Sequence, residues 1–298
     1  MVYAGIDGGG STLRVAIIDD SLVSLAEEQR STANPSVIGR EAAAALIQDA
    51  LRAAAARVSL PIEGVGIGVA GASAAHSADW LVSVIAAILP GVPVFPSTDH
   101  EIALVGAHGA RRDAIILAGT GSVALAINAR GERVQAGGWG YLLGDEGSGA
   151  WLALEALRAC ARWHDGSSAE AHALAQRVLT AFGFSYPTDL IAYVYRQPPP
   201  VRELAAHARI VLDAAGEGDD YAQAIVVRGA QALAQITRSA IQRAKLDRPT
   251  IQFCGGLLSF DNPLSVALCA ELGLSERPVP LHSPVIGAAL LAKLELNQ

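Results

Sequence analysis

The strongest constraint on the fold is a strand–turn–strand pattern that occurs twice. Residues 2–19, VYAGIDGGGSTLRVAIID, begin with an apolar run, pass through three consecutive glycines and return as an alternating apolar run. Residues 114–128, AIILAGTGSVALAIN, repeat this order, so that Asp7-Gly8-Gly9-Gly10-Ser11 aligns with Ala118-Gly119-Thr120-Gly121-Ser122. Short apolar runs that meet at glycines predict β-hairpins. The repeat therefore predicts two similar α/β halves, each with a Gly-rich hairpin, that face each other across a ligand cleft.

The segments after each hairpin alternate between helical and extended patterns. Stretches rich in Ala and Leu predict helices at 40–58, 78–89, 99–108, from about 147, over most of 168–245, at 263–272 and from about 284. Shorter apolar runs predict strands at 21–29, 65–71, 92–97, 131–138, 250–256 and 278–281. This alternation is typical of an α/β fold.

Length and composition favour a soluble, cytoplasmic protein. The chain has 298 residues, of which 51% are hydrophobic, so one large domain or two moderate ones can form. The three cysteines are far apart and include no CxxC pair, which favours a reducing compartment and no zinc site. No basic segment precedes Asp7, which argues against a signal peptide. The most apolar run, 80–95, contains Pro90 and Pro93 and is shorter than the ~18 residues of a membrane span.

The charge distribution argues against nucleic acid as a partner. The formal net charge is −7, and Lys245 and Lys293 are the only lysines. Proteins that bind nucleic acid present a basic patch or stripe, and no long basic run occurs here. We therefore expect no nucleic-acid partner.

The first glycine turn has two interpretations. Glycines supply positive φ in hairpin turns, but three in succession exceed that need and also let backbone N–H groups converge on an anion. No lysine follows, and the next segment is a strand, so the turn is neither a P-loop nor a Rossmann motif. Asp7 ends the preceding strand, where a carboxylate either holds Mg²⁺ or only initiates the turn. The second turn, GTGS, is weak evidence of a phosphate-binding loop by itself. Its functional interpretation depends on its alignment with the first turn.

A second acidic candidate follows the strand expected at 92–97. Thr98 and Glu101 have the spacing of a helix capping box, which explains the segment structurally. Asp99, however, falls just after the carboxyl end of that strand, where open α/β sheets bind ligands. Both interpretations of Asp99 stay open, and we expect His100 to be incidental.

Other loops contain polar or glycine residues with a structural and a functional explanation. Asn34 precedes a helix and either caps it or binds a polar substrate. Gly255 and Gly256 end a strand and either turn tightly or form a flat surface beside a nucleoside, which the loop at 216–219 would flank. Cys254 is expected to be a small buried residue rather than a nucleophile.

The stretch 137–151, GGWGYLLGDEGSGAW, is the most unusual loop of the chain. In a structural interpretation, Asp145 caps the following helix and Glu146 strengthens its first turn. That interpretation does not account for Trp139 or for the surrounding glycines. The alternative is a loop that forms one wall of a binding site.

Together these motifs resemble the BadF/BadG/BcrA/BcrD ATPase family, and within it the N-acetylglucosamine and glucosamine kinases. DGGGST, STD, AGTGS, GGWGxxxGDEGSxxW and CGG occur in the family's order over nearly the whole chain. The resemblance implies two RNase H-like domains of the actin/hexokinase/Hsp70 type with a cleft between them. We expect the first at 1–112, the second with a helical insertion at 113–283, and the helix at 284–298 as a candidate to complete the first.

The resemblance also implies a role for each motif. It makes Asp99 the catalytic base and Asp7 the acid associated with Mg²⁺. It assigns ATP to Gly8, Gly9, Gly10, Ser11, Gly119, Thr120, Gly121, Ser122, Gly255 and Gly256. It assigns the sugar to Asn34, Asp99, Gly138, Trp139, Gly140 and Asp145. His100 and Glu101 depart from the family, which frequently has small residues after the base.

The activity that the resemblance implies is ATP-dependent phosphorylation of an amino sugar. N-acetylglucosamine, converted to its 6-phosphate, is the first expectation, glucosamine is the alternative, and a homodimer is favoured. A family member of another class, a BadF-type ATPase that activates an electron-transfer enzyme, would need cysteines for an Fe–S cluster. Residues 1–159 contain none. A nucleotide- or sugar-binding regulator without activity is the third alternative.

Overall fold

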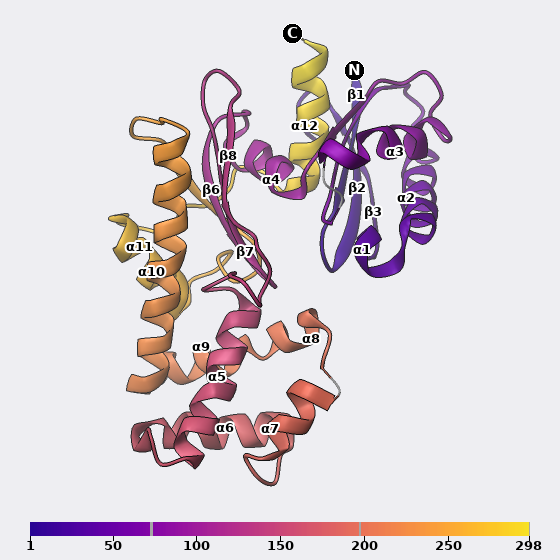
Figure 1. Cartoon of the computed structure of the whole chain (residues 1–298). Coiled ribbons are helices and arrows are strands. Elements are labelled where there is room, and N and C mark those ends of the chain that lie inside the picture. The colour runs from indigo at the N-terminus through magenta and orange to yellow at the C-terminus, as the bar shows by residue number, and fades with distance from the viewer. Residues whose placement is uncertain (72–73, 197, 298) are drawn as a thin grey trace. The chain divides into compact units, whose positions relative to one another are not determined.

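The computed structural model describes residues 1–71, 74–196 and 198–297, with two compact units (Figure 1). The first comprises Met1–Ile115, Ile127–Glu132 and Pro280–Gln298. The second comprises Ile116–Ala126 and Arg133–Val279. Each unit contains a β-sheet with its own helices, and the two are described separately.

The first unit is built on a five-stranded sheet of order β3-β2-β1-β4-β5. Its strands are β1 (Val2–Gly8), β2 (Thr12–Asp19), β3 (Ser24–Ser31), β4 (Ile62–Val69) and β5 (Val94–Ser97). β1 pairs antiparallel with β2, and β2 antiparallel with β3, whereas β1, β4 and β5 run parallel. The carboxyl ends of the three parallel strands therefore meet at one edge of the sheet.

Helices complete the first unit. They are α1 (Pro35–Ile38), α2 (Arg40–Ala55), α3 (Ala74–Ala86), α4 (Asp99–His108) and α12 (Pro284–Leu296). β1 is buried along its whole length, because alternate residues pack against two separate apolar clusters. Ile6 belongs to the cluster that includes α2 and α3, and Tyr3 to the cluster that includes α12. The two faces of the sheet are thus both covered, as in other sheets with parallel strands.

The C-terminal helix α12 lies unusually close to the first sheet. Gly5 and Gly66 are register partners on β1 and β4, and a Cβ at either position would overlap the backbone of α12 near Val285 and Ala288. The absence of side chains at these two positions lets α12 pack directly on the strands. The last helix of the chain is therefore part of the first unit.

The second unit contains a four-stranded sheet of order β8-β7-β6-β9. Its strands are β6 (Asp113–Ala118), β7 (Ser122–Ile127), β8 (Arg133–Gly137) and β9 (Ile251–Cys254). When the strands of each half are numbered from its first strand, β8-β7-β6-β9 has the same order as β3-β2-β1-β4. The predicted repeat of the fold is therefore confirmed. In each half, a Gly-rich turn connects the first two strands.

The helices of the second unit form most of residues 149–272. They are α5 (Gly149–His164), α6 (His172–Phe182), α7 (Asp189–Ile191), α8 (Val201–Ala206), α9 (Ala208–Gly216), α10 (Asp220–Arg243) and α11 (Pro263–Leu272). A 3₁₀ turn (Ala169–Ala171) precedes α6, and a π-helix (Ala192–Arg196) follows α7. α10 packs against β8, α5, α9 and α11.

One sequence prediction about secondary structure is wrong. Residues 278–281 form no strand, because Pro278 and Pro280 have no N–H group to donate to a sheet. Instead the N–H groups of Leu281 and His282 donate to the carbonyls of Ala107 and Gly106 at the end of α4. The helix expected from about residue 147 is confirmed and begins at Gly149.

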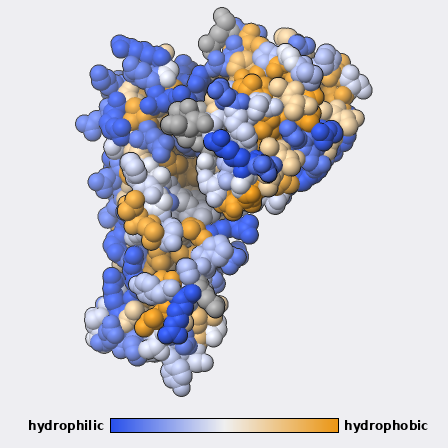
Figure 2. Space-filling model, turned by 45° about the vertical axis from the view of Figure 1, so that its right-hand side comes forward, coloured by the Kyte–Doolittle hydropathy of each residue, from blue (hydrophilic) through white to orange (hydrophobic). Residues whose placement is uncertain are grey.

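The surface carries hydrophobic and hydrophilic residues side by side (Figure 2). Three of the most exposed apolar side chains, Trp139, Leu142 and Leu143, belong to the glycine-rich loop after β8. Within the part of the chain that the structure describes, no helix is both long and apolar enough to span a membrane.

Candidate active site

The turn between β1 and β2 is tight and open at its tip. The N–H of Gly9 donates to the carbonyl of Thr12 at 3.0 Å, and the Thr32 hydroxyl donates to the Gly9 carbonyl at 3.2 Å. None of Gly8, Gly9 and Gly10 has a positive φ, so the turn conformation does not require glycine at these positions. A Cβ at Gly10 would meet no atom within 4 Å. Gly10 therefore leaves space at the tip, which suits the close approach of a ligand.

Asp7 is a buried carboxylate at the carboxyl end of β1. It is 7% exposed, and the Arg14 guanidinium lies 4.0 Å from its Oδ2. The pKa of Asp7 is raised to about 7, mainly by burial and also by the charge of Asp99, whereas the charge of Arg14 lowers it. A carboxylate with so little compensating charge is suited to a cation.

The groups around Asp7 fit a magnesium ion that is shared with phosphate. Magnesium prefers oxygen ligands and commonly takes only one or two carboxylates, with phosphate and water completing its shell. Among the described residues, no group of three or more His, Cys, Asp or Glu side chains is arranged to hold a metal. Asp7 supplies one carboxylate close to the open tip at Gly10, where such an ion could reach it.

Asp99 is the first residue of α4, directly after β5. Thr98 is the N-cap, and its hydroxyl accepts from the N–H of Glu101 at 3.2 Å, so the predicted cap is confirmed. The Asp99 side chain is 34% exposed, and its Oδ1 lies 3.2 Å from Nδ1 of His100. His100 therefore contacts the acid, and its expected incidental role stays a prediction. Because β1 and β5 run parallel, Asp7 and Asp99 lie at the same edge of the sheet.

Asn34 caps the short helix α1. Its Oδ1 accepts from the N–H of Ser36 at 2.9 Å, and its own N–H donates to the Thr32 hydroxyl at 3.1 Å. A Cβ at Gly71 would overlap the Asn34 side chain, so Asn34 lies against the segment that follows β4. The expected capping role is confirmed, and the position is near the carboxyl end of a parallel strand.

In the second unit, the turn between β6 and β7 is fixed by the start of α5. The N–H of Gly119 donates to the Gly121 carbonyl at 2.9 Å. The N–H groups of Gly149 and Ala150 donate to the carbonyls of Gly119 and Thr120 at 2.8 and 3.3 Å. The turn is thus held through its carbonyls.

Asp145 links this turn to the loop after β8. Its Oδ1 accepts from the N–H of Gly140 at 3.2 Å, and it also accepts from the backbone of Ser122. A Cβ at Gly121 would lie 2.5 Å from its Oδ2, so glycine is needed there. Burial raises the pKa of Asp145, although the hydrogen bonds from Gly140 and Ser122 lower it.

The expectation that Asp145 caps α5 is wrong. The N-cap is Ser148, whose hydroxyl accepts from the N–H of Trp151 at 3.2 Å. Asp145 has a φ of 58° and lies before the helix, with its carboxylate directed to Gly140 instead. Glu146 also precedes the first turn of α5, which contains no acidic residue.

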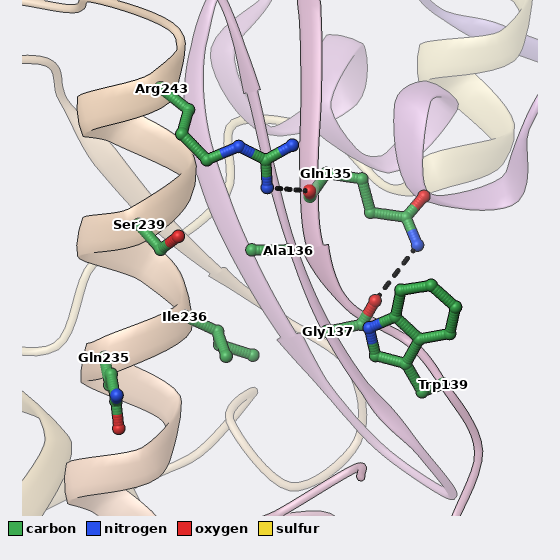
Figure 3. A pocket seen from close by; sticks show the side chains of 8 residues that line it. All are labelled: Gln135, Ala136, Gly137, Trp139, Gln235, Ile236, Ser239 and Arg243. Atoms are coloured by element: carbon green, nitrogen blue, oxygen red, sulfur yellow. Dashed lines mark hydrogen bonds between the residues drawn. The ribbon is translucent and has the colours of Figure 1, made fainter. Parts of the chain in front are cut away.

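Trp139 is 74% exposed and lines a cavity of about 540 Å³ between β8 and α10 (Figure 3). Gly138 ties the loop to the hairpin, because its N–H donates to the Ser122 carbonyl at 2.9 Å. The Gln135 amide donates to the Gly137 carbonyl at 3.2 Å, and Arg243 donates to the Gln135 carbonyl at 3.0 Å. The loop predicted to bind sugar is therefore anchored on β7 and β8, with its indole at the surface.

Gly255 and Gly256 lie against the second hairpin. Gly255 has a φ of 86°, and a Cβ there would overlap the Ala118 backbone. The Leu257 N–H donates to the Ala118 carbonyl at 3.1 Å. Gly256 also borders a cavity of about 790 Å³, whose lining includes Gly216 and Glu217. The two segments expected to flank a nucleoside thus meet at one cavity.

The cysteines are buried and free. Burial raises the pKa of Cys254 to about 12, which keeps its thiol protonated at neutral pH. The expectation of a small buried residue at this position is confirmed.

The chain is thus an α/β protein in which two sheets share the strand order of a repeat. The chain belongs to the BadF/BadG/BcrA/BcrD ATPase family, whose model matches residues 4–292.

Curated relatives match along nearly the whole chain. An N-acetylmuramic acid/N-acetylglucosamine kinase of Clostridium acetobutylicum is 26% identical, with 98% of each chain covered. An N-acetyl-D-glucosamine kinase of Dictyostelium discoideum is 25% identical, with 98% of this chain and 97% of the relative covered. A glucosamine kinase of Vibrio cholerae is 31% identical over 55% of this chain and 56% of the relative.

Solved structures share the fold. A Chromobacterium violaceum protein assigned as an N-acetylglucosamine kinase superposes with a TM-score of 0.76 at 27% identity, covering 97% of this chain and 98% of that one. A ROK hexokinase from Thermus thermophilus has a TM-score of 0.62 at 17% identity, covering 100% of this chain and 99% of that one, and supports the fold alone.

Proposed function

We propose that this protein is an ATP-dependent kinase that phosphorylates an amino sugar, with N-acetylglucosamine as the acceptor and its 6-phosphate as the product. The observation that carries the proposal is the pair Asp7 and Asp99 at one edge of the first sheet, beside an open glycine turn. The full-length relatives that act on N-acetylglucosamine support the choice of sugar. The partial match to a glucosamine kinase makes glucosamine the second candidate.

Asp99 acts as the general base in this proposal. Its partly exposed carboxylate accepts the proton of the sugar hydroxyl while that oxygen attacks the γ-phosphorus, and ADP leaves. General-base assistance contributes about 10²–10⁴-fold to such a step. His100 contacts Asp99 Oδ1 and leaves the second carboxylate oxygen for the substrate.

Asp7 would hold Mg²⁺, which when bound neutralises charge on the phosphate oxygens. Gly8–Ser11 and Gly119–Ser122 would bind the phosphates through their backbone N–H groups, and Gly255 and Gly256 would border the adenosine. Exclusion of water from the bound substrates would limit the loss of ATP to hydrolysis.

The residues that we propose to contact the sugar are Asn34, Asp99, Gly138, Trp139, Gly140 and Asp145. Asp145 supports this role because hydrogen bonds from the backbone of Gly140 and Ser122 hold the orientation of its carboxylate. We also propose that the enzyme works in the cytoplasm as a homodimer, which light scattering of the purified protein would test.

Phosphorus NMR of the purified protein tests the reaction itself. With ATP, Mg²⁺ and N-acetylglucosamine, we expect a sugar 6-phosphate resonance that grows with the ADP signals. Inorganic phosphate and ADP without any sugar phosphate would contradict the proposal and leave an ATPase.

A further inference from the structure

The first turn of α4 contains a carboxylate that the proposed mechanism does not use. Glu101 lies two residues after Asp99, and its side chain is only 1% exposed. A buried charge is stable only when it is paired and hydrogen-bonded. The contacts of Glu101 therefore show what the residue does for this turn.

The side chains of Ser97 and Arg111 are among the groups that hold the Glu101 carboxylate. The Ser97 hydroxyl donates to Oε2 at 2.8 Å, and Nε of Arg111 donates to Oε1 at 2.6 Å. Arg111 also donates through NH1 to Oε1 of Glu295 at 2.6 Å. The network joins the end of β5, the helix α4, the segment after α4 and the C-terminal helix α12.

Asp99 lies inside this network. Ser97 is two residues before it and Glu101 two residues after it, so their hydrogen bond bridges the Asp99 backbone. Thr98 caps the same turn, and a Cβ at Gly68 would lie only 2.7 Å from the Thr98 carbonyl oxygen, so β4 packs directly against it. The partly exposed Asp99 side chain depends on this backbone for its position.

We propose that Glu101 is a positioning residue for Asp99, with Arg111 as its counter-ion. Glu101 acts by fixing the strand-to-helix turn from which the base projects, and it contacts neither sugar nor nucleotide. The proposal rests on the proposed role of Asp99. Because a displacement of about 1 Å can slow an enzyme about 10²-fold, a looser turn should lower kcat and leave KM nearly unchanged.

Glu101→Gln in the full chain is the primary test. The substitution keeps the shape and removes the charge that pairs with Arg111. We expect kcat to fall about 10- to 100-fold, with KM for sugar and ATP changed less than about 3-fold. Arg111→Lys keeps the charge without the planar donor geometry, so we expect a smaller loss of kcat.

Glu155→Gln is the matched control. Glu155 is a buried carboxylate on α5 that pairs with Arg158 at 2.6 Å and Arg228 at 2.5 Å. Its substitution should destabilise the protein comparably and leave kcat within about 2-fold of the wild type. A kcat loss in Glu101→Gln no larger than in Glu155→Gln would overturn the positioning role.

The Asp99→Asn background separates positioning from general damage. If Glu101 acts through Asp99, Glu101→Gln should lower the residual turnover of Asp99→Asn little or not at all. An equal fold-loss in both backgrounds would overturn the proposal. If Glu101→Gln does not fold, Arg111→Lys provides the same comparison. If the wild-type protein phosphorylated no sugar, both the proposed function and the role of Asp99 as the base would be wrong.

Discussion

Among single residues, Asp99 decides whether the proposed chemistry is right. Asp99→Asn keeps the size of the side chain and its place at the end of β5, but it removes the proton acceptor. We expect turnover to fall about 10²–10⁴-fold while ATP affinity stays near that of the wild type. Steady-state rates and calorimetric titration with ATP measure the two quantities. Sugar phosphorylation at a near-wild-type rate by this variant would eliminate Asp99 as the base.

Asp7 makes stability depend on pH in a direction unusual for a carboxylate. Its pKa is about 7 in the folded protein, mainly because of burial, whereas an unfolded Asp titrates near ~3.9. The folded state therefore holds the proton more tightly. The contribution of Asp7 to stability is largest below the unfolded pKa and is lost as pH rises toward the folded pKa.

Asp7→Asn should remove this dependence. Without divalent cations at about pH 8, we expect the variant to be more stable than the wild type, by up to about 4 kcal/mol, and the difference to disappear below about pH 4. Urea unfolding in the presence of a chelator at several pH values provides the measurement. Subtracting the free energy of unfolding of the wild type from that of the variant removes the contributions of the other titrating groups. A variant that is less stable than the wild type at about pH 8 would show that the buried, ionised carboxylate of Asp7 does not destabilise the folded protein.

The local sequence predicts where Asp7, Asp99 and Asp145 lie along the chain, but not all of the groups that contact their carboxylates. Thr98 was correctly predicted as a cap, because capping spacing is local. Asp145 was wrongly predicted as a cap, because Ser148 three residues later competes for the same helix and takes the position. Asp145 instead pairs with Gly140 and Ser122, a choice that depends on how the loop folds back and that local spacing does not encode.

At the scale of elements, the first hairpin can be tested separately from the sheet that carries it. Gly10 has no positive φ and no neighbour that a Cβ would meet, so Gly10→Ala should change stability by less than about 0.5 kcal/mol. If phosphates approach the turn here, the added methyl group should raise KM for ATP about 10-fold. Initial rates at varied ATP and thermal melts measure both effects.

Gly66→Ala is the contrasting substitution. Its Cβ would overlap the α12 backbone, so we expect a loss of about 1–3 kcal/mol in the free energy of unfolding. The KM for ATP of the folded fraction should stay unchanged. An unchanged KM in Gly10→Ala, or a raised KM in Gly66→Ala, would argue that the turn tip does not contact ATP.

At the scale of the whole molecule, the repeat was predictable because both hairpins have strong local signals. The order β3-β2-β1-β4 recurs as β8-β7-β6-β9, in agreement with the aligned turns. The segment 278–281 resembled a strand by its apolar residues, although its two prolines favoured a loop that ends on α4. The domain boundaries at 112 and 283 stay a prediction.

The Glu101 network could not have been predicted, because its partners are far apart in sequence. Arg111 joins Glu101 to Glu295, which lies 184 residues further along the chain. The available signal was one charged residue directly before the apolar stretch 102–107 of α4. Such a residue must be paired, but only the folded chain brings α12 to it.

The most direct test of the central claim is ADP release by the purified protein across a panel of sugars. The panel contains N-acetylglucosamine, glucosamine, N-acetylmuramic acid and glucose, with a control that lacks sugar. We predict ADP release that depends on sugar and is fastest with N-acetylglucosamine. Equal release in every reaction, including the control, would contradict the account and leave a nucleotide hydrolase.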